Sequence, residues 1–280
     1  LTLGSLFCSQ AQEKILSLED AVMNARRIIP IKNPARVSWN EEGMPYEEAG
    51  SRPRQAGMGT MNAQETYSLQ FTNTRKVWRL HTRGDYYLID AKTGEKRQLG
   101  KDFPEASLMF AKFSPDGTRV AYVSGNNIYM EYCDPAQHEN NGVVALTTSG
   151  NDTIVNGTFD WVYEEEFSCR DGFRWSADSK FIAYWNSNTA GTGWFNIINN
   201  VDSIYPTVQQ FPYPKAGTTN SAVKVGFVDV DTQSTTWVPI PGDERNNYIP
   251  RMEFVPGTDR LMIQQMNRAQ SLNTVWTVDI

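Results

Sequence analysis

Hydrophobic and polar residues alternate in short runs over most of the chain. Strand-like runs occupy residues 86–90, 128–132, 223–230 and 275–279, and turns rich in Asp, Asn and Gly separate such runs. Alternation over a few residues predicts a strand with one buried face, whereas an amphipathic helix repeats every three to four residues. The pattern therefore predicts an all-β fold of short antiparallel strands.

One sequence pattern recurs along the chain and predicts a series of similar hairpins. Residues 113–122 (FSPDGTRVAY) match residues 175–184 (WSADSKFIAY), and residues 254–263 (FVPGTDRLMI) form a weaker copy. In the first copy Pro, Asp and Gly are the residues that favour a tight turn. Hairpins repeated at intervals of tens of residues favour a β-propeller, with a chance likeness between hairpins of a β-sandwich as the alternative. At about 40–50 residues per blade, residues 37–280 hold roughly four to six blades.

The amino-terminal residues follow a different pattern. Residues 1–11 are mostly apolar or small and place small residues at the −3 and −1 positions of an export cleavage site after Ala11. Residues 12–36 predict a short N-terminal helix, because Ser17 opens a capping box and apolar residues follow at helical spacing. We therefore expect a signal-peptide remnant (1–11), a helical lead (12–36) and an incomplete propeller domain (37–280).

Composition and charge argue against several classes of protein. The chain has a net charge of -6 and no basic stripe, which argues against nucleic-acid binding. It has no apolar run of about 18 residues, the length of a membrane-spanning helix. Its 2 His and 3 Cys lack the spacing of a metal site, so we expect neither a metal nor a cofactor. The sequence leaves open whether Cys133 and Cys169 form a disulfide or remain buried thiols.

Residues 160–167 (DWVYEEEF) combine three consecutive Glu with aromatic residues. A run of Glu is most often a solvated surface, but Trp161, Tyr163 and Phe167 tie this run to apolar packing. Partly desolvated carboxylates repel one another and attract a cation. A primary ammonium suits a carboxylate pair because it has three hydrogen-bond donors. Two adjacent carboxylates converge more easily on a short helical turn than on a strand.

With this segment the sequence resembles a known family. Residues 160–167 are similar to the double-glutamate motif of the dipeptidyl peptidase IV family, serine exopeptidases of the prolyl oligopeptidase clan. The resemblance covers about residues 85–280, and its motifs are more specific than the hairpin repeat alone. Further similar segments are 151–157 (NDTIVNG), 175–184 (WSADSKFIAY), 212–217 (PYPKAG), 248–251 (YIPR) and 265–268 (QMNR).

The resemblance implies an eight-bladed propeller that caps an α/β-hydrolase domain. It places the double Glu on a short helix, where Glu165 and Glu166 hold the free amino group of a peptide. Glu164, Tyr163 and Trp161 are supporting candidates, and Glu164 is expected to be structural. Two residues of extended chain span roughly 7 Å, so an anchored amine presents the second peptide bond for cleavage.

The sequence departs from the family pattern in two respects. Family members often add an Arg from a loop before the Ser-Pro hairpin, but residues 100–105 contain none. Lys101 is the candidate replacement, as a point charge rather than a bidentate fork. No Gly-x-Ser-x-Gly motif is present, and neither His81 nor His138 matches the family's catalytic His. We therefore expect no catalytic residue here, and the chain alone should not hydrolyse peptides.

Residues 194–214 form an apolar insert between strand signals. Left bare, such a segment would expose a large apolar area. The family uses an extended hairpin arm here for dimer contacts, and the alternative is a blade edge that packs locally.

These expectations combine into one functional hypothesis. The chain would be the substrate-gating and amine-anchoring propeller of an exported serine dipeptidyl peptidase, periplasmic or on the cell surface of a bacterium. The enzyme would release X-Pro or X-Ala dipeptides from peptides. Its partners would be the peptide substrate, the α/β-hydrolase domain of the same polypeptide and a second copy of the chain. The alternative is a periplasmic propeller that binds a peptide or protein partner without catalysis.

Overall fold

The chain divides into two compact units, residues 1–53 and 54–280. In the first unit, β1 (Val37–Trp39) pairs with β2 (Pro45–Glu47) in an antiparallel hairpin. The signal remnant and helical lead expected at residues 1–36 lie outside the described residues. The computed structural model describes residues 37–39, 45–47, 60–134, 136 and 142–280.

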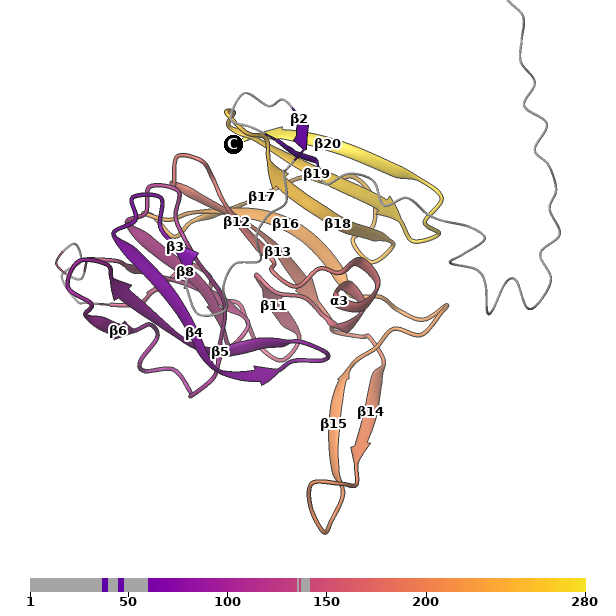
Figure 1. Ribbon diagram of the computed structural model, residues 1–280. Coiled ribbons are helices and arrows are strands. Elements are labelled where there is room, and N and C mark those ends of the chain that lie inside the picture. Colours follow the sequence, from indigo (N-terminus) through magenta and orange to yellow (C-terminus); the bar gives the residue numbers. More distant parts are fainter. Residues whose placement is uncertain (1–36, 40–44, 48–59, 135, 137–141) are drawn as a thin grey trace, which may run out of the picture. The chain divides into compact units, whose positions relative to one another are not determined.

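The described part of the second unit consists of four successive antiparallel meanders (Figure 1). Each has the strand order of a propeller blade, which confirms the predicted all-β propeller class. The first blade contains β3 (Thr60–Met61), β4 (Tyr67–Lys76), β5 (His81–Asp90) and β6 (Lys96–Gln98). The second contains β7 (Leu108–Phe113), β8 (Arg119–Ser124), β9 (Asn127–Tyr132) and β10 (Val144–Ala145).

The third and fourth blades complete the series. In the third, β11 (Ile154–Asn156) and β12 (Phe173–Trp175) both pair with β13 (Phe181–Asn188), followed by β16 (Ala222–Asp229) and β17 (Thr235–Trp237). The fourth contains β18 (Asn247–Phe254), β19 (Arg260–Asn267) and β20 (Asn273–Asp279). Four blades in the described residues fall within the predicted range of four to six.

Each hydrophobic core is sandwiched between two consecutive blades. Leu88 of the first blade packs with Tyr122 of the second, and Met130 of the second packs with Phe173 of the third. The third core joins Trp185 to Ile263 of the fourth blade, and the Trp185 indole donates a hydrogen bond to the carbonyl of Ile249 over 2.8 Å. Because the second and third blades contribute side chains to a core on each of their two faces, the four blades support one another in sequence order.

The recurring hairpin motif forms the turn between the first and second strands of three blades. In the first copy Gly117 has φ +67°, and Asp116 accepts the backbone N–H of Thr118 over 3.0 Å, as the motif predicts. In the second copy Ser179 adopts the positive φ, and Asp178 accepts the N–H of Lys180. The same local chemistry therefore makes the same turn at β7–β8 and β12–β13.

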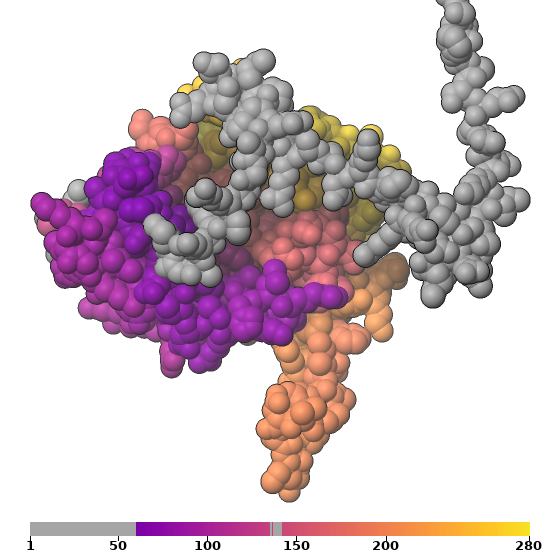
Figure 2. Space-filling model, viewed as in Figure 1, coloured from indigo at the N-terminus to yellow at the C-terminus, as the bar shows by residue number. Residues whose placement is uncertain are grey.

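The apolar insert forms a separate two-stranded hairpin, β14 (Trp194–Asn199) and β15 (Thr207–Pro212), which we call the arm. The arm extends away from the blades of the second unit (Figures 1 and 2). Its tip is bare, with Val201 89% and Ile204 97% exposed. The insert is therefore not a blade edge that packs locally.

Two further points were not settled by the sequence pattern. Strand β4 was not among the predicted strands: the alternation of residues 67–72 is short, and the second half projects as an exposed hairpin with β5 that carries polar side chains on both faces. Cys133 and Cys169 are both buried free thiols. Burial raises the pKa of the Cys133 thiol to about 12 and also raises that of Cys169.

Candidate functional site

The acidic segment leaves the first strand of the third blade and returns to it. Strands β11 and β12 pair with consecutive stretches of β13, and the chain between them makes an excursion from the sheet. Gly157 and Gly172 close the neck of this excursion, because the N–H of Gly172 donates to the carbonyl of Gly157 over 3.0 Å. The N–H of Gly157 also donates to the carbonyl of Trp185 in β13, and the N–H of Trp185 donates to the carbonyl of Gly172. The neck fixes the excursion to the blade at its two ends.

The excursion contains helix α3 (Trp161–Phe167), so the predicted short helical turn is present. Asp160 caps its start by accepting the N–H of Tyr163 over 3.0 Å, and the hydroxyl of Ser221 donates to the same carboxylate over 2.6 Å. Burial raises the pKa of Asp160 despite these hydrogen bonds. The helix ends at Ser168, which adopts the left-handed conformation with φ 57°.

Tyr163 fixes the helix to the next blade. Its side chain is buried between the rings of Phe159 and Phe167, with centroids 5.4 Å away in both cases. The N–H of Ile249, in β18 of the fourth blade, donates to the Tyr163 hydroxyl over 3.0 Å. Burial holds the pKa of Tyr163 well above its ordinary value. Tyr163 therefore orients the helix and presents no group to a ligand.

The three consecutive glutamates lie in three different environments. Glu164 is buried, its carboxylate lies 3.4 Å from the guanidinium Nε of Arg170, and burial raises its pKa. Glu165 is partly buried and pairs with Arg79 at 2.8 Å. Glu166 is exposed, and none of the described residues forms an ion pair or hydrogen bond with its carboxylate. Glu164 is thus placed for a structural contact, whereas Glu165 and Glu166 open toward solvent.

The cation beside Glu165 comes from a hairpin that the sequence analysis did not single out. Among the described residues, the ion-pair partner of Glu165 is Arg79, from the β4–β5 hairpin, and Lys101 stays a prediction as the replacement for the family's Arg. The guanidinium Nε donates to the carboxylate over 2.8 Å, and the Arg79 side chain is 78% exposed. Sequence reasoning missed Arg79 because 86 positions separate it from Glu165, and local patterns carry no information about such a contact.

Aromatic side chains form one wall beside the helix. Trp161 packs against Tyr213, with ring centroids 4.6 Å apart, and lies 6.3 Å from Phe211 at the base of the arm. Trp78, next to Arg79 in the hairpin, packs against the other side of Phe211 at 4.6 Å. This aromatic wall connects the hairpin, the helix and the arm around the two carboxylates.

The arrangement suits recognition of a cation with several donors. Two neighbouring carboxylates on one turn of helix accept charge-assisted hydrogen bonds, and the aromatic wall restricts water on one side. Arg79 offsets part of the negative charge on Glu165 through its ion pair at 2.8 Å.

Other candidate chemistry is sparse in the part of the chain that the structure describes. No group of His, Cys, Asp and Glu there could hold a metal ion, and no helix there is long and apolar enough to cross a membrane. His81 is exposed at the start of β5 and lies 3.0 Å from the hydroxyl of Thr74. His138 lies outside the described residues.

The fold and the candidate site together define a β-propeller with an acidic helix beside an aromatic wall on its third described blade. Residues 62–280 match the family model of the dipeptidyl peptidase IV N-terminal region. The chain belongs to this family, as its motifs indicated.

Individual relatives agree with this assignment. The chain is 30% identical over 224 residues to a probable dipeptidyl-aminopeptidase B of Arthroderma benhamiae, a match that covers 75% of this chain and 24% of that protein. It also resembles the crystal structure of Porphyromonas gingivalis dipeptidyl peptidase 4, with TM-score 0.72, 30% identity, 81% of this chain and 32% of that one. The chain thus spans about a quarter of the length of the curated relatives it matches.

A second solved structure supports the fold alone. The chain resembles a putative dipeptidyl aminopeptidase IV from Bacteroides ovatus with TM-score 0.54 and 20% identity. The match covers 70% of this chain and 25% of that one.

Proposed function

We propose that Glu165 and Glu166 anchor the free amino group of a peptide substrate. The observation that supports this proposal is their placement: two neighbouring carboxylates project from a helix that two glycines hold off the blade. Glu165 is held by Arg79 at 2.8 Å, while the carboxylate of Glu166 is exposed. An ammonium between them would replace water with charge-assisted hydrogen bonds, and the aromatic wall would face the first side chain of the peptide.

The anchor would act as a ruler for a reaction carried out elsewhere in the complete protein. Two residues of extended chain span roughly 7 Å, so a nucleophile at that distance meets the second peptide bond. We propose that the complete protein is a serine dipeptidyl peptidase, in which an α/β-hydrolase domain forms an acyl-enzyme and releases X-Pro or X-Ala dipeptides. The propeller would gate access and position the substrate, and this chain would supply no catalytic residue.

Substitution of the two glutamates tests this proposal in the complete protein. We expect Glu165→Gln and Glu166→Gln each to lower kcat/KM for dipeptide release roughly 10- to 100-fold, because each amide loses one charged acceptor of the ammonium. Glu244→Gln is the matched control, since Glu244 is exposed and belongs to the β17–β18 loop. Unchanged kinetics in both variants would contradict the anchoring role.

The proposal also covers the assembly and the location of the complete protein. We propose that the arm contacts a second copy of the protein, because Ile198, Val201, Ile204 and Tyr205 are exposed apolar residues on one hairpin. We also propose export to the periplasm or cell surface, on the basis of residues 1–11, whose sequence resembles the end of a signal peptide.

A further inference from the structure

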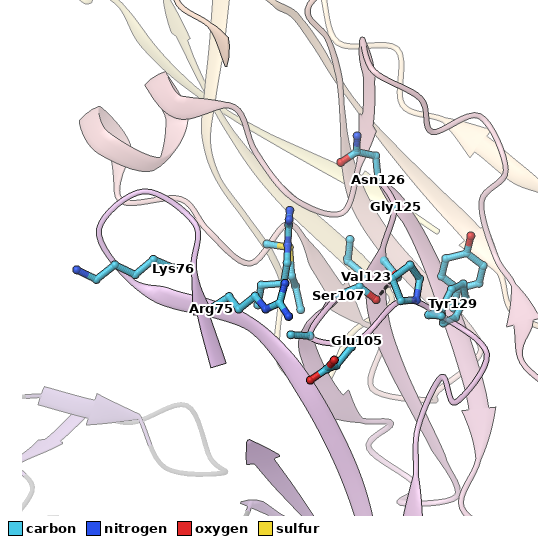
Figure 3. Close-up of a pocket in the computed structure, with 14 residues that line it drawn as sticks. Arg75, Lys76, Glu105, Ser107, Val123, Gly125, Asn126 and Tyr129 are labelled. Carbon is cyan, nitrogen blue, oxygen red and sulfur yellow. Dashed lines mark hydrogen bonds between the residues drawn. The ribbon is translucent and has the colours of Figure 1, made fainter. Parts of the chain in front are cut away.

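A second polar site lies apart from the glutamate pair. A cavity of about 530 Å³ opens between the first and second blades, a size typical of a small-ligand site. Figure 3 shows its walls, formed by the β4–β5 hairpin, the β6–β7 loop and the turn between β8 and β9. No residue of α3 lines this cavity.

Two arginines without ion-pair partners face each other at the cavity. Arg75 and Arg83 are directly opposite across β4 and β5, and the register is irregular on both sides of Arg75. Like charges in this position destabilise a strand pair, so the arrangement has a cost that a bound anion would offset. Among the described residues, neither guanidinium forms an ion pair. The two arginines therefore form a local cationic site in a chain whose net charge is -6.

The other lining residues define what kind of anion fits. The side chain of Lys76 runs away from the cavity in Figure 3, and Glu105 accepts a hydrogen bond from Asn73 over 2.7 Å. The hydroxyls of Ser107 and Ser124 lie 3.2 Å apart on the opposite wall and can donate to a ligand. Apolar side chains fill the remaining wall, including those of Phe103, Met109, Val123 and Tyr129. The cavity therefore suits a carboxylate on a short aliphatic stem, held by guanidinium forks.

The cavity is connected to the amine-anchoring helix α3 in two ways, by closeness in the sequence and by one backbone hydrogen bond. Arg75 and Arg83 each stand four positions from Arg79, the residue that pairs with Glu165. Four positions of extended chain span at most roughly 13 Å at about 3.3 Å per residue, and the turn at residues 77–80, where the Val77 N–H donates to the Leu80 carbonyl, makes this separation shorter. On the far wall, the carbonyl of Asn126 accepts the N–H of Asn156 over 3.0 Å, directly before the neck of the excursion. The cavity is thus built into the elements that position α3.

We propose that this cavity binds an acidic side chain of the peptide whose amino group α3 anchors. This inference rests on the proposed function. A distance of at most roughly 13 Å corresponds to no more than about four extended residues, which limits the acidic side chain to the first five residues of the peptide. Residues one and two are the anchored residue and the Pro or Ala of the proposed dipeptide, so the acidic side chain belongs to residues three to five, in the part of the substrate that leaves.

The test measures peptide binding to the complete protein by calorimetry. The peptides carry a ketomethylene group in place of the second peptide bond and differ only in Glu or Gln at residues three, four and five. We expect the Glu peptide to bind about three- to tenfold more tightly than the Gln peptide, as for a partly solvated ion pair. Arg75→Gln combined with Arg83→Gln should abolish this preference, whereas Lys76→Gln, on the same hairpin but directed away, should retain it.

Acetylation of the peptide amino group separates this inference from the proposed function. If acetylation weakens binding but Glu and Gln peptides bind equally, the cavity proposal is wrong and the anchor stands. If acetylation has no effect, the proposed anchor fails, and the inference fails with it. Glutarate serves as a free-carboxylate probe. Glutarate binding that depends on Arg75 and Arg83, without any preference between the peptides, would assign the cavity to a free anion and overturn the peptide proposal.

Discussion

At the scale of single residues, Lys112 has the clearest pH-dependent role. Its ammonium lies 2.6 Å from one carboxylate oxygen of Asp171 and donates to the carbonyl of Phe173 over 2.8 Å. Burial lowers the pKa of Lys112 to about 8 from 10.5, and the attraction of Asp171 only partly opposes this. Between about pH 8 and pH 10.5, Lys112 is deprotonated in the folded protein but still protonated in the unfolded chain. The free energy of unfolding therefore gains a term that rises with pH in this window.

Replacement of this lysine by methionine isolates its contribution. We expect the free energy of unfolding of the wild type, minus that of Lys112→Met, to increase from pH 8 toward pH 10, by at most about 1.4 kcal/mol per pH unit. Tyrosines and other lysines titrate in both proteins and cancel in the difference. Urea unfolding at several pH values measures it, and Lys180→Met, at an exposed turn, is the control. A flat difference would show that Lys112 titrates as it does in the unfolded chain.

Single residues also show which features of the site the sequence motifs could predict and which they could not. The resemblance to the family motif and the need for two carboxylates to converge predicted a short helix at residues 160–167, and α3 is present there. The motif gave no means of finding Arg79, whose position depends on how the first and third blades meet. Lys101 stays a prediction as the replacement for the family's Arg, whereas the contact with Glu165 comes from the β4–β5 hairpin. Roles set by long-range packing are therefore the part that sequence reasoning misses.

At the scale of elements, the excursion that carries α3 depends on its narrow neck. A Cβ atom on Gly172 would lie 2.5 Å from the carbonyl carbon of Gly157 and 2.7 Å from the N of Thr158. Both are backbone atoms, so no side chain can move aside to make room. The excursion can therefore leave and rejoin the strand at this point only because Gly172 has no side chain.

We expect Gly172→Ala to open the neck and displace the helix. Overpacking of this kind costs about 1–3 kcal/mol of stability, and the displaced glutamates should also bind peptide more weakly. Gly193→Ala is the matched control, because the nearest atom to its Cβ would be the carbonyl oxygen of Tyr213 at 3.8 Å. Urea unfolding and peptide calorimetry measure both effects. Equal stability of the two variants would mean that the neck relaxes at no cost.

The elements themselves were predictable to different degrees, for physical reasons. The turns at residues 113–122 and 175–184 were predicted correctly because their Ser, Asp and Gly chemistry acts within a few residues. Strand β4 was not, because the apolar and polar alternation of residues 67–72 is short and the rest of the strand is polar and exposed. The excursion between β11 and β12 was also not predictable, since nothing local shows that two short strands share one partner.

At the scale of the whole molecule, the blades are connected by ionic contacts as well as by shared cores. Lys112 of the second blade bonds Asp171, directly before the first strand of the third. Arg174, in that strand, donates to Glu253 of the fourth blade over 2.8 Å. The same regions hold the neck of the excursion, so the position of α3 depends on how three blades pack together. The repeat motif predicted the blades, but this connection required the structure.

The arm carries apolar side chains that the blades leave uncovered, and it supports a prediction about assembly. Val201 and Ile204 are 89% and 97% exposed at its tip, where the blades do not cover them. Apolar side chains at the centre of an interface contribute most of its affinity, and a buried carboxylate there is unfavourable. We therefore expect Val201→Asp combined with Ile204→Asp to raise the dimer dissociation constant of the complete protein at least about tenfold.

Sedimentation equilibrium measures this constant, and Leu272→Asp provides the control. Leu272 is also exposed, at 61%, but it lies in the β19–β20 turn, away from the arm in the sequence and in the sheet order. Its substitution adds one negative charge, against two in the arm variant, and removes exposed apolar area outside the arm, so it should leave the dimer unchanged. If both variants dissociate equally, the effect is one of net charge and not of the arm. A wild-type protein that stays monomeric at high concentration would leave the bare apolar tip to a different partner and would exclude self-association through it.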